Sequence, residues 1–261
     1  MSDRGAVPDA LGRMAERPRE YAKIALRRFL HKRHLDLVAD PYPVRVATTL
    51  SWLGARTVLD VGANIGQYAT ALRAGGYRGT IVSCEPLSDA FQHLQRRSAR
   101  DASWEAVRTA VGDAVGSTRI NVSANSYSSS LLPMTSAHSD AAPGSEFVAA
   151  ETVPVTTVAE IVAGRGVDPG SALLKIDTQG YEAQVLDGAG DLLPRFAAVS
   201  LELSFVPLYE GQQLYDQLTA RLRDGGFTLY GLDAGFGDPR TGRMLQCDGL
   251  FVRSDLVARA S

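Results

Sequence analysis

Cysteine and long apolar runs are scarce in this chain of 261 residues. Its two cysteines, Cys84 and Cys247, lie far apart and form neither a metal-binding spacing nor a disulfide framework. We therefore expect a reducing, cytoplasmic location. No stretch of about 18 consecutive apolar residues occurs, so no transmembrane helix is expected. The first residues also lack the apolar core of a secretory signal.

Aromatic residues make up 7% of the chain and do not interleave with a basic groove. The sequence therefore predicts no nucleic-acid partner. The rest of the composition is close to that of globular proteins, which excludes a disordered or fibrous chain. The length allows one large α/β domain or two small ones.

Charge is distributed unevenly along the chain. Residues 1–34 contain nine basic and four acidic side chains, although the formal net charge of the whole chain is −2. Five apolar residues in this segment recur at the spacing of one helix face: Tyr21, Ile24, Ala25, Phe29 and Leu30. We expect residues 1–42 to form a basic helical arm that covers the body of the protein. Contact of this arm with an anionic lipid, an acidic partner or a second copy of the chain is an open alternative.

Short apolar strands alternate with helical segments over residues 43–261, which we expect to form the main domain. The expected strands are 57–61, 80–84, 106–111, 118–122, 152–155, 172–176, 198–203, 227–232 and 249–252, and the expected helices are 43–54, 65–74, 88–99, 181–188 and 212–224. Repeated strand–helix–strand units require right-handed crossovers and a sheet covered on both faces. The sequence thus predicts a doubly wound α/β fold whose ligands bind beyond the carboxyl ends of the strands.

A polar, serine-rich segment over residues 125–144 interrupts this alternation. It contains Ser128, Ser129 and Ser130 and shows no clear periodicity. Such a long irregular segment within a compact domain is typical of a functional loop. We therefore predict a lid-like insertion at about 124–150, whose serines would suit a hydroxylated acceptor.

Two of the expected strands end in residues suited to a nucleoside ligand. After strand 57–61 come Gly62 and Gly66, with Asn64 where a dinucleotide-binding loop would have its middle glycine. This loop suits a small zwitterion, such as the methionine end of S-adenosylmethionine, better than a pyrophosphate. Glu85 follows strand 80–84 and can accept both ribose hydroxyls, and Asp113 follows the next strand, where it could hold the adenine amino group.

Acidic residues also follow the later strands. Asp177 ends the apolar strand 172–176 and must be paired or face a ligand, as a base, an orienting group or a ligand of Mg²⁺. Glu182, which also suits a helix N-terminus, and Glu202, at the end of strand 198–203, are candidate acceptor contacts. His138 lies in the predicted lid and is the histidine placed to act as a general base, with Asp177 as its rival. No tight cluster of ligands demands a metal.

These motifs resemble those of the FkbM family of S-adenosylmethionine-dependent methyltransferases. The resemblance covers residues 57–252 and rests on Asp60 to Tyr68, Glu85-Pro86, Ser128 to Leu131, Lys175 to Glu182 and Asp248 to Val252. It implies a class I methyltransferase fold with seven strands, the last antiparallel. It also implies that Asp60, Gly62, Asn64, Gly66, Tyr68 and Glu85 line the cofactor site, that Asp113 lies near the adenine, and that Asp177 and the serines face the acceptor.

The resulting hypothesis is O-methylation of a sugar or natural-product acceptor of the glycoside or macrolide type, with S-adenosylmethionine as cofactor. Transfer to nitrogen, a nicotinamide-dependent dehydrogenase and a non-catalytic nucleoside-binding module are the alternatives. The missing Gly-x-Gly-x-x-Gly pattern argues against the dehydrogenase. Dependence on Mg²⁺ and assembly as a homodimer stay open.

Overall fold

Strand β7 (Ala172–Ile176) is the middle strand of a seven-stranded sheet in the computed structural model, which describes residues 42–125 and 127–259. All five of its residues are buried, as expected for a strand covered on both faces. The other strands of this sheet are β1 (Thr57–Val61), β2 (Thr80–Cys84), β3 (Trp104–Val107), β8 (Ala198–Ser204), β9 (Phe227–Ala234) and β10 (Gln246–Arg253).

The strand order is β3-β2-β1-β7-β8-β10-β9. Strand β10 runs antiparallel to both β8 and β9, whereas β1, β2, β3, β7 and β8 pair in parallel. From the adjacent strands β1 and β7, the chain adds β2 and β3 on one side and β8, β10 and β9 on the other. The carboxyl ends of β1 and β7 therefore form the switch point where ligands of such sheets bind. The predicted class I methyltransferase fold, with seven strands and the last antiparallel, is confirmed.

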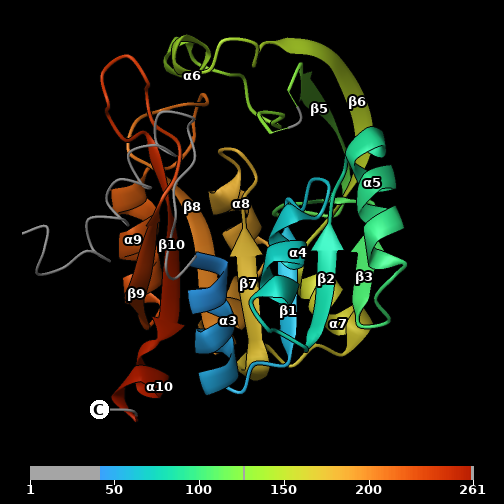
Figure 1. Cartoon of the computed structure of the whole chain (residues 1–261), viewed down its shortest axis with the longest axis vertical. Coiled ribbons are helices and arrows are strands. Elements are labelled where there is room, and N and C mark those ends of the chain that lie inside the picture. Colours follow the sequence, from blue (N-terminus) through green and yellow to red (C-terminus); the bar gives the residue numbers. More distant parts are fainter. Residues whose placement is uncertain (1–41, 126, 260–261) are drawn as a thin grey trace, which may run out of the picture. The chain divides into compact units, whose positions relative to one another are not determined.

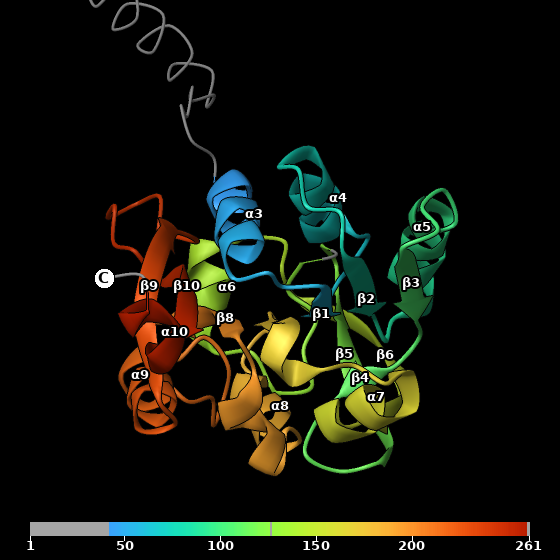
Figure 2. The same ribbon diagram turned by 90° about the horizontal axis from the view of Figure 1, so that it is seen from below.

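Helices cover both faces of this sheet (Figure 2). One face carries α3 (Tyr42–Trp52), α4 (Gln67–Ala74) and α5 (Ser88–Ser98); the other carries α7 (Val158–Arg165), α8 (Glu182–Asp187) and α9 (Tyr215–Asp224). Two short 3₁₀ helices, Pro169–Ser171 and Gly190–Arg195, and helix α10 (Ser254–Ala258) complete the set. No helix in the described ranges is both long and apolar enough to span a bilayer.

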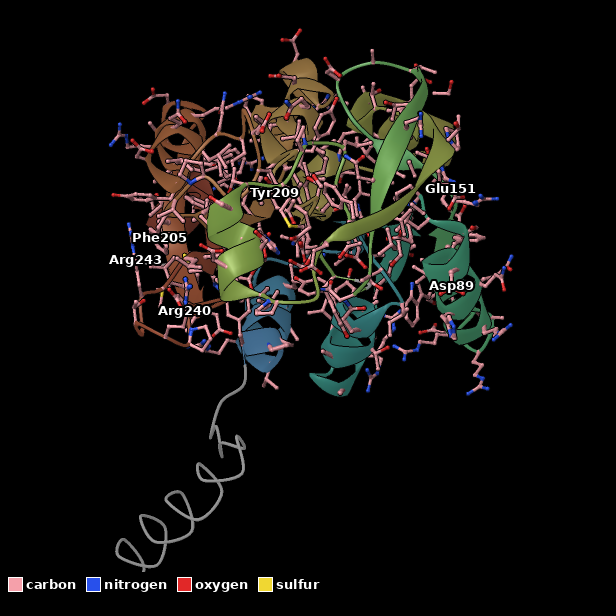
Figure 3. All side chains as sticks on the ribbon, turned by 90° about the horizontal axis from the view of Figure 1, so that it is seen from above. Asp89, Glu151, Phe205, Tyr209, Arg240 and Arg243 are labelled. Carbon is pink, nitrogen blue, oxygen red and sulfur yellow. The ribbon has the colours of Figure 1, made fainter. Side chains whose placement is uncertain are left out.

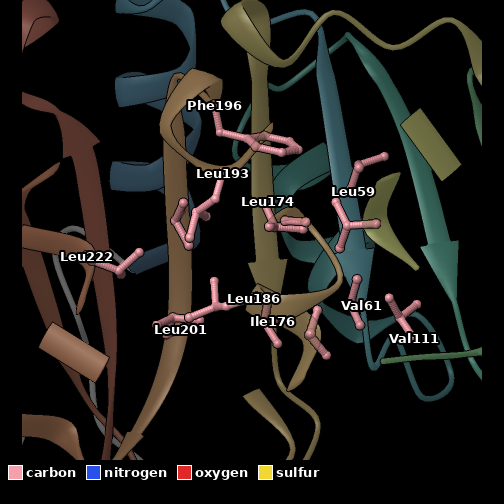
Figure 4. Close-up of a cluster of buried hydrophobic side chains, with 14 of the residues drawn as sticks. Leu59, Val61, Val111, Leu174, Ile176, Leu186, Leu193, Phe196, Leu201 and Leu222 are labelled. Carbon is pink, nitrogen blue, oxygen red and sulfur yellow. The ribbon is translucent and has the colours of Figure 1, made fainter. Parts of the chain in front are cut away.

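The alternation of side chains along each strand produces two apolar cores. Leu59, Val61, Leu174 and Ile176 point to the α7–α9 face, where they pack with Phe196 in the core shown in Figure 4. The intervening residues of the same strands face α3 and α4 and form a second core. Because each sheet face is apolar, the charged residues of the strands gather at the carboxyl ends.

The lid-like insertion lies over the carboxyl ends of the strands (Figure 1). It is carried by a second sheet of order β4-β6-β5, formed by β4 (Ala110–Val111), β5 (Gly116–Ser123) and β6 (Phe147–Thr156). Helix α6 (Ser136–Ala141) lies within the segment that joins β5 to β6. The serine-rich residues belong to the same connection.

One predicted strand differs from the structure, and one observed helix was not predicted. The single strand expected at 106–111 is divided, because β3 pairs with β2 whereas β4 pairs with β6 in the second sheet. Helix α7 was not expected, although the Thr157 side chain caps it by accepting a hydrogen bond from the Glu160 N–H. The predicted basic arm at residues 1–42 lies, except for its last residue, outside the described residues.

Candidate functional site

A pocket of about 370 Å³ opens at the carboxyl ends of β1, β2 and β7, beneath the β5–β6 connection. Eight of the predicted site residues line it: Gly62, Asn64, Glu85, Ser128, Ser129, His138, Asp177 and Glu202. Apolar side chains of Leu87, Val111 and Ile120 form part of the wall near Glu85. The tertiary structure thus brings together residues that span more than half of the chain.

The turn after β1 forms the floor of the pocket. Gly62 has φ +75°, and a Cβ at this position would collide with the carbonyl oxygen of Asp177. The Gly62 and Ala63 N–H groups both donate to the Cys84 carbonyl oxygen, at 3.1 and 3.0 Å. These two donors are therefore used within the sheet, and the missing Cβ of Gly62 allows β1 and β7 to approach each other closely at this turn.

Glu85 joins the end of β2 to this turn. Its Oε2 accepts a hydrogen bond from the Asn64 N–H at 2.8 Å, and its Oε1 accepts one from the Leu87 N–H at 2.9 Å. Burial raises the pKa of Glu85 to about 7, although both backbone hydrogen bonds lower it. Each oxygen retains a lone pair that could accept a hydroxyl group of a ligand.

Asp60 and Tyr68 lie beneath the pocket and do not line it. Asp60 is fully buried, accepts a hydrogen bond from the Ser83 hydroxyl at 2.9 Å and lies 3.2 Å from Lys175 Nζ. Lys175 Nζ also lies over the Tyr68 ring, 5.1 Å from its centroid. Strand alternation turns Asp60 toward α3 and α4, and Tyr68 lies on α4 itself. Both side chains support the floor from below, and their contact with a cofactor stays a prediction.

Gly66, Ser130, Glu182 and Asp113 likewise do not line the pocket. Gly66 (φ +85°) precedes α4 with Leu94 and Trp104 packed against it, which leaves no room for a Cβ. Glu182 accepts hydrogen bonds from the Thr178 and Gly180 N–H groups and so closes the turn after β7. Asp113 is exposed. The predicted contacts of Glu182 with the acceptor and of Asp113 with the adenine stay predictions.

Lys175 connects the floor to Asp177. Its Nζ donates to the Gly62 carbonyl oxygen at 3.2 Å and lies 3.5 Å from Asp177 Oδ2. Burial by itself would lower the pKa of Lys175, but Asp60 and Asp177 raise it above its ordinary value. The ammonium group is therefore charged and held below the pocket.

Gln179 organises the carboxyl ends of β7 and β8. Its backbone is in the left-handed region (φ +56°), and its Nε2 donates both to Asp177 Oδ1 at 2.9 Å and to Glu202 Oε2 at 2.8 Å. Its Oε1 accepts a hydrogen bond from the Tyr209 hydroxyl at 3.0 Å. A strained residue that is held by so many partners is typical of a functional site.

The β5–β6 connection is attached to this same network. The Ser130 hydroxyl donates to the Gln179 carbonyl oxygen at 2.6 Å, and the Tyr209 hydroxyl oxygen also lies 3.2 Å from the Ser128 carbonyl oxygen. His138 Nε2 lies 3.1 Å from the Ser128 hydroxyl. Ser130 thus contacts Gln179 rather than the pocket, and the serine-rich segment is fixed to the end of β7.

The His138 ring is 3% exposed and lies between two other rings, with centroids 5.2 Å from Tyr209 and 5.7 Å from Phe236. Burial lowers its pKa, so the ring is neutral at pH 7. Asp177 is more accessible, since its side chain is 34% exposed. Of the two predicted bases, Asp177 is therefore the one that a ligand reaches more easily.

Sequence reasoning missed Gln179, Tyr209, Phe236 and Gln246. Gln179 stands within a motif that had been singled out, but an uncharged amide gives no electrostatic signal. Tyr209 and Phe236 lie in connections after β8 and β9 that have no recognisable spacing. In the described part of the chain no three His, Cys, Asp or Glu side chains gather as metal ligands, so the predicted Mg²⁺ site at Asp177 gains no support.

Comparisons with known proteins give one family match and several similar solved structures. The model of the Methyltransferase FkbM domain matches residues 60–229. A search of curated proteins gives no significant match. Among solved structures, an FkbM methyltransferase from Methylobacillus flagellatus is 15% identical with a TM-score of 0.46; the alignment covers 76% of this chain but only 43% of that one.

Two further solved structures have similar folds. A SAM-dependent methyltransferase from Aquifex aeolicus is 12% identical, with 81% of this chain and 88% of that one covered and a TM-score of 0.39. A putative tRNA (m1A22) methyltransferase from Streptococcus pneumoniae, solved with S-adenosyl-L-methionine, is 11% identical, with 82% and 72% covered and a TM-score of 0.44. Because the family model spans well over half of the sequence, the chain belongs to the FkbM family of S-adenosylmethionine-dependent methyltransferases.

Proposed function

We propose that the pocket binds S-adenosylmethionine and that the protein transfers its methyl group to a hydroxyl of a sugar or natural-product acceptor of the glycoside or macrolide type. The observation that carries this proposal is the joint position of Glu85 and Asp177 in one cavity, on either side of the Gly62 turn. The first suits a ribose and the second an acceptor hydroxyl.

The end of the pocket at Glu85 fits the nucleoside part of the cofactor. Two backbone N–H groups fix the Glu85 carboxylate so that its free lone pairs can accept the ribose hydroxyls. Leu87, Val111 and Ile120 supply apolar surface for a flat base. Gly62 lines the same pocket, and the amino-acid part of the cofactor would lie along this turn.

The end of the pocket at Asp177 fits a hydroxylated acceptor. When bound, S-adenosylmethionine supplies a methyl group whose carbon–sulfur bond breaks, leaving both electrons on sulfur, as the new carbon–oxygen bond forms. Asp177 accepts the proton of the attacking hydroxyl, and Ser128 and Ser129 offer further hydroxyl partners. The lid segment excludes water from this end, and the chain mainly aligns the two reactants.

Calorimetry and mass spectrometry test the proposal directly. We expect S-adenosylhomocysteine, but not NAD⁺, to bind and to raise the melting temperature. A panel of glycosides and macrolide alcohols incubated with S-adenosylmethionine should yield a product that is heavier by one methylene group. Methylation of amines alone would favour the nitrogen-transfer alternative, and cofactor binding without any transfer would favour a non-catalytic module.

Cofactor affinity should depend on pH through Glu85. Its pKa of about 7 means that about a tenth is ionised at pH 6 and about nine tenths at pH 8. Because the ionised carboxylate is the better acceptor for ribose hydroxyls, we expect S-adenosylhomocysteine to bind about tenfold more tightly at pH 8 than at pH 6 by calorimetry. Glu85→Gln should weaken binding at pH 8 and lose this dependence; a variant with the same pH dependence would refute the ribose contact.

His138 should matter more for the lid than for proton transfer, because its Nε2 is engaged with Ser128 and its ring is buried. We expect His138→Gln to lower kcat/KM for the acceptor about tenfold while leaving the shape of the pH–rate profile unchanged. Rates measured from pH 5 to 9 check this. Loss of one limb of the profile would instead make His138 the base.

A further inference from the structure

The side chains that line the pocket carry an excess of negative charge, and this excess bears on the charge of the acceptor. Three carboxylates line the pocket, those of Glu85, Asp177 and Glu202, and no lysine or arginine of the described residues does so. Figure 3, which looks down on the carboxyl ends of the strands, shows Arg240 and Arg243 at the margin of the molecule and Tyr209 near its centre. Arg240 is paired with Asp238 at 3.0 Å.

Lys175, the cation below the floor, cannot offset this charge alone. It lies 3.2 Å from Asp60 and 3.5 Å from Asp177, and these two carboxylates share it. The three groups together carry one net negative charge when ionised. Bound S-adenosylmethionine, with a sulfonium, an ammonium and a carboxylate, has one net positive charge and would balance them.

Glu85 and Glu202 remain without a cation after this count, but Glu85 accepts two backbone N–H hydrogen bonds at the nucleoside end of the pocket, which leaves Glu202 at the acceptor end. Its Oε2 accepts a hydrogen bond from the neutral Gln179 amide, and among residues 42–125 and 127–259 it takes part in no ion pair. Its cross-strand neighbour is another acid, because Asp248 on β10 pairs with Glu202 on β8. Burial and the neighbouring Asp177, Glu182 and Asp248 raise the pKa of Glu202 well above its ordinary value.

A positively charged ligand group would offset the repulsion between Glu202 and the neighbouring acids. A phosphate or carboxylate would instead add repulsion at a site of low dielectric constant. The ring of Phe236, which also lines the pocket, offers an apolar face to such a group. Gln179 holds Glu202 beside Asp177, so the cation would lie next to the proposed base.

We propose that the acceptor carries an ammonium group close to the hydroxyl that is methylated, as an amino sugar does, and that Glu202 selects it. This inference rests on the proposed function. It names one property of the acceptor, its charge, and assigns the recognition of that charge to one residue of the pocket wall.

Three glycosides of matched size test this proposal: methyl β-D-glucosaminide, methyl β-D-glucoside and methyl β-D-glucuronide. They are titrated by calorimetry into protein saturated with S-adenosylhomocysteine, and their methylation is followed by mass spectrometry. We expect the glucosaminide to be favoured over the glucoside at least tenfold and the glucuronide not to bind. Glu202→Gln keeps the size of the side chain. In this variant, the ratio of the affinity for the glucosaminide to that for the glucoside should fall to about one.

Asp233→Asn is the matched control, because Asp233 is aligned with Asp248 on the next strand but lies outside the pocket and pairs with Arg45 at 3.0 Å. It should leave the ratio unchanged. Four outcomes would overturn the proposal. They are binding of the glucuronide as tight as that of the glucosaminide, preference for the glucoside, binding of none of the three glycosides, and an unchanged ratio in Glu202→Gln. A tenfold loss of S-adenosylhomocysteine affinity in Glu202→Gln without a change in the ratio would also overturn it, since Glu202 would then serve the cofactor.

Failure of the charge selection and failure of the proposed function give different results in these binding and methylation measurements. Methylation of all three glycosides at similar rates would leave O-methyl transfer intact and overturn the charge selection. Selective binding of the glucosaminide without any methyl transfer to oxygen would support the charge selection and refute the proposed reaction.

Discussion

Asp177→Asn should lower kcat by about 10²- to 10⁴-fold, the usual contribution of a positioned general base. The amide has the same shape as the carboxylate, but it cannot accept a proton from the acceptor hydroxyl. The nucleoside end of the pocket does not involve Asp177, so affinity for S-adenosylhomocysteine should change less than threefold. Turnover with the best acceptor of the panel and calorimetry with S-adenosylhomocysteine provide the two measurements.

The control for this variant is Asp187→Asn. Asp187 is half exposed and pairs with Arg221 at 2.8 Å on the surface, where an ion pair contributes about 0–1 kcal/mol. Its replacement should change neither rate nor affinity. Near-normal turnover in Asp177→Asn would remove Asp177 from the mechanism and leave His138 as the candidate base.

Gly62→Ala should destabilise the fold by about 3 kcal/mol or more and abolish cofactor binding. The added Cβ would collide with the carbonyl oxygen of Asp177, and the positive φ of +75° disfavours any side chain. Because Asp177 N donates to the Val61 carbonyl oxygen at 3.1 Å, relief of the collision must separate the ends of β1 and β7. Urea unfolding and calorimetry with S-adenosylhomocysteine measure both effects.

Gly54→Ala separates the two causes of this destabilisation. Gly54 has a similar φ of +62°, but a Cβ there would meet no atom within 4 Å. The variant should therefore show only the conformational cost, about 1 kcal/mol, and keep full cofactor affinity. Similar losses of stability in the two variants would mean that the collision at Gly62 is relieved without moving the strands.

The strands of the parallel sheet could be predicted closely from the sequence. The observed β1, β2 and β7 coincide with the predicted 57–61, 80–84 and 172–176, because continuous apolar runs that end in glycine or an acid leave few other arrangements. The segment after β3 could not be predicted in this way. Arg108 and Thr109 interrupt residues 106–111 without a glycine or proline to mark a break, and only pairing with β6 assigns Ala110 to a different sheet.

The sequence indicated many of the residues that line the pocket but not all of them. Glu85, Asp177 and Glu202 follow or end their strands and line the pocket as expected. Asp60 stands inside its strand, so the alternation of side chains buries it beneath the floor beside Lys175. Gln179 was overlooked because its importance comes from its four hydrogen-bonding partners, three of which belong to other segments of the chain.

The sequence by itself determined the strands β1, β2 and β7, the glycine turn and the acids that follow or end the strands, because these depend on local periodicity and on the cost of burying charge. Only the tertiary structure decided which acids share a cavity, which of them lack a cation and how the serine-rich segment is tied to Gln179. These properties depend on the strand order of the sheet and on the direction of each side chain, which are set by contacts between residues far apart in the chain.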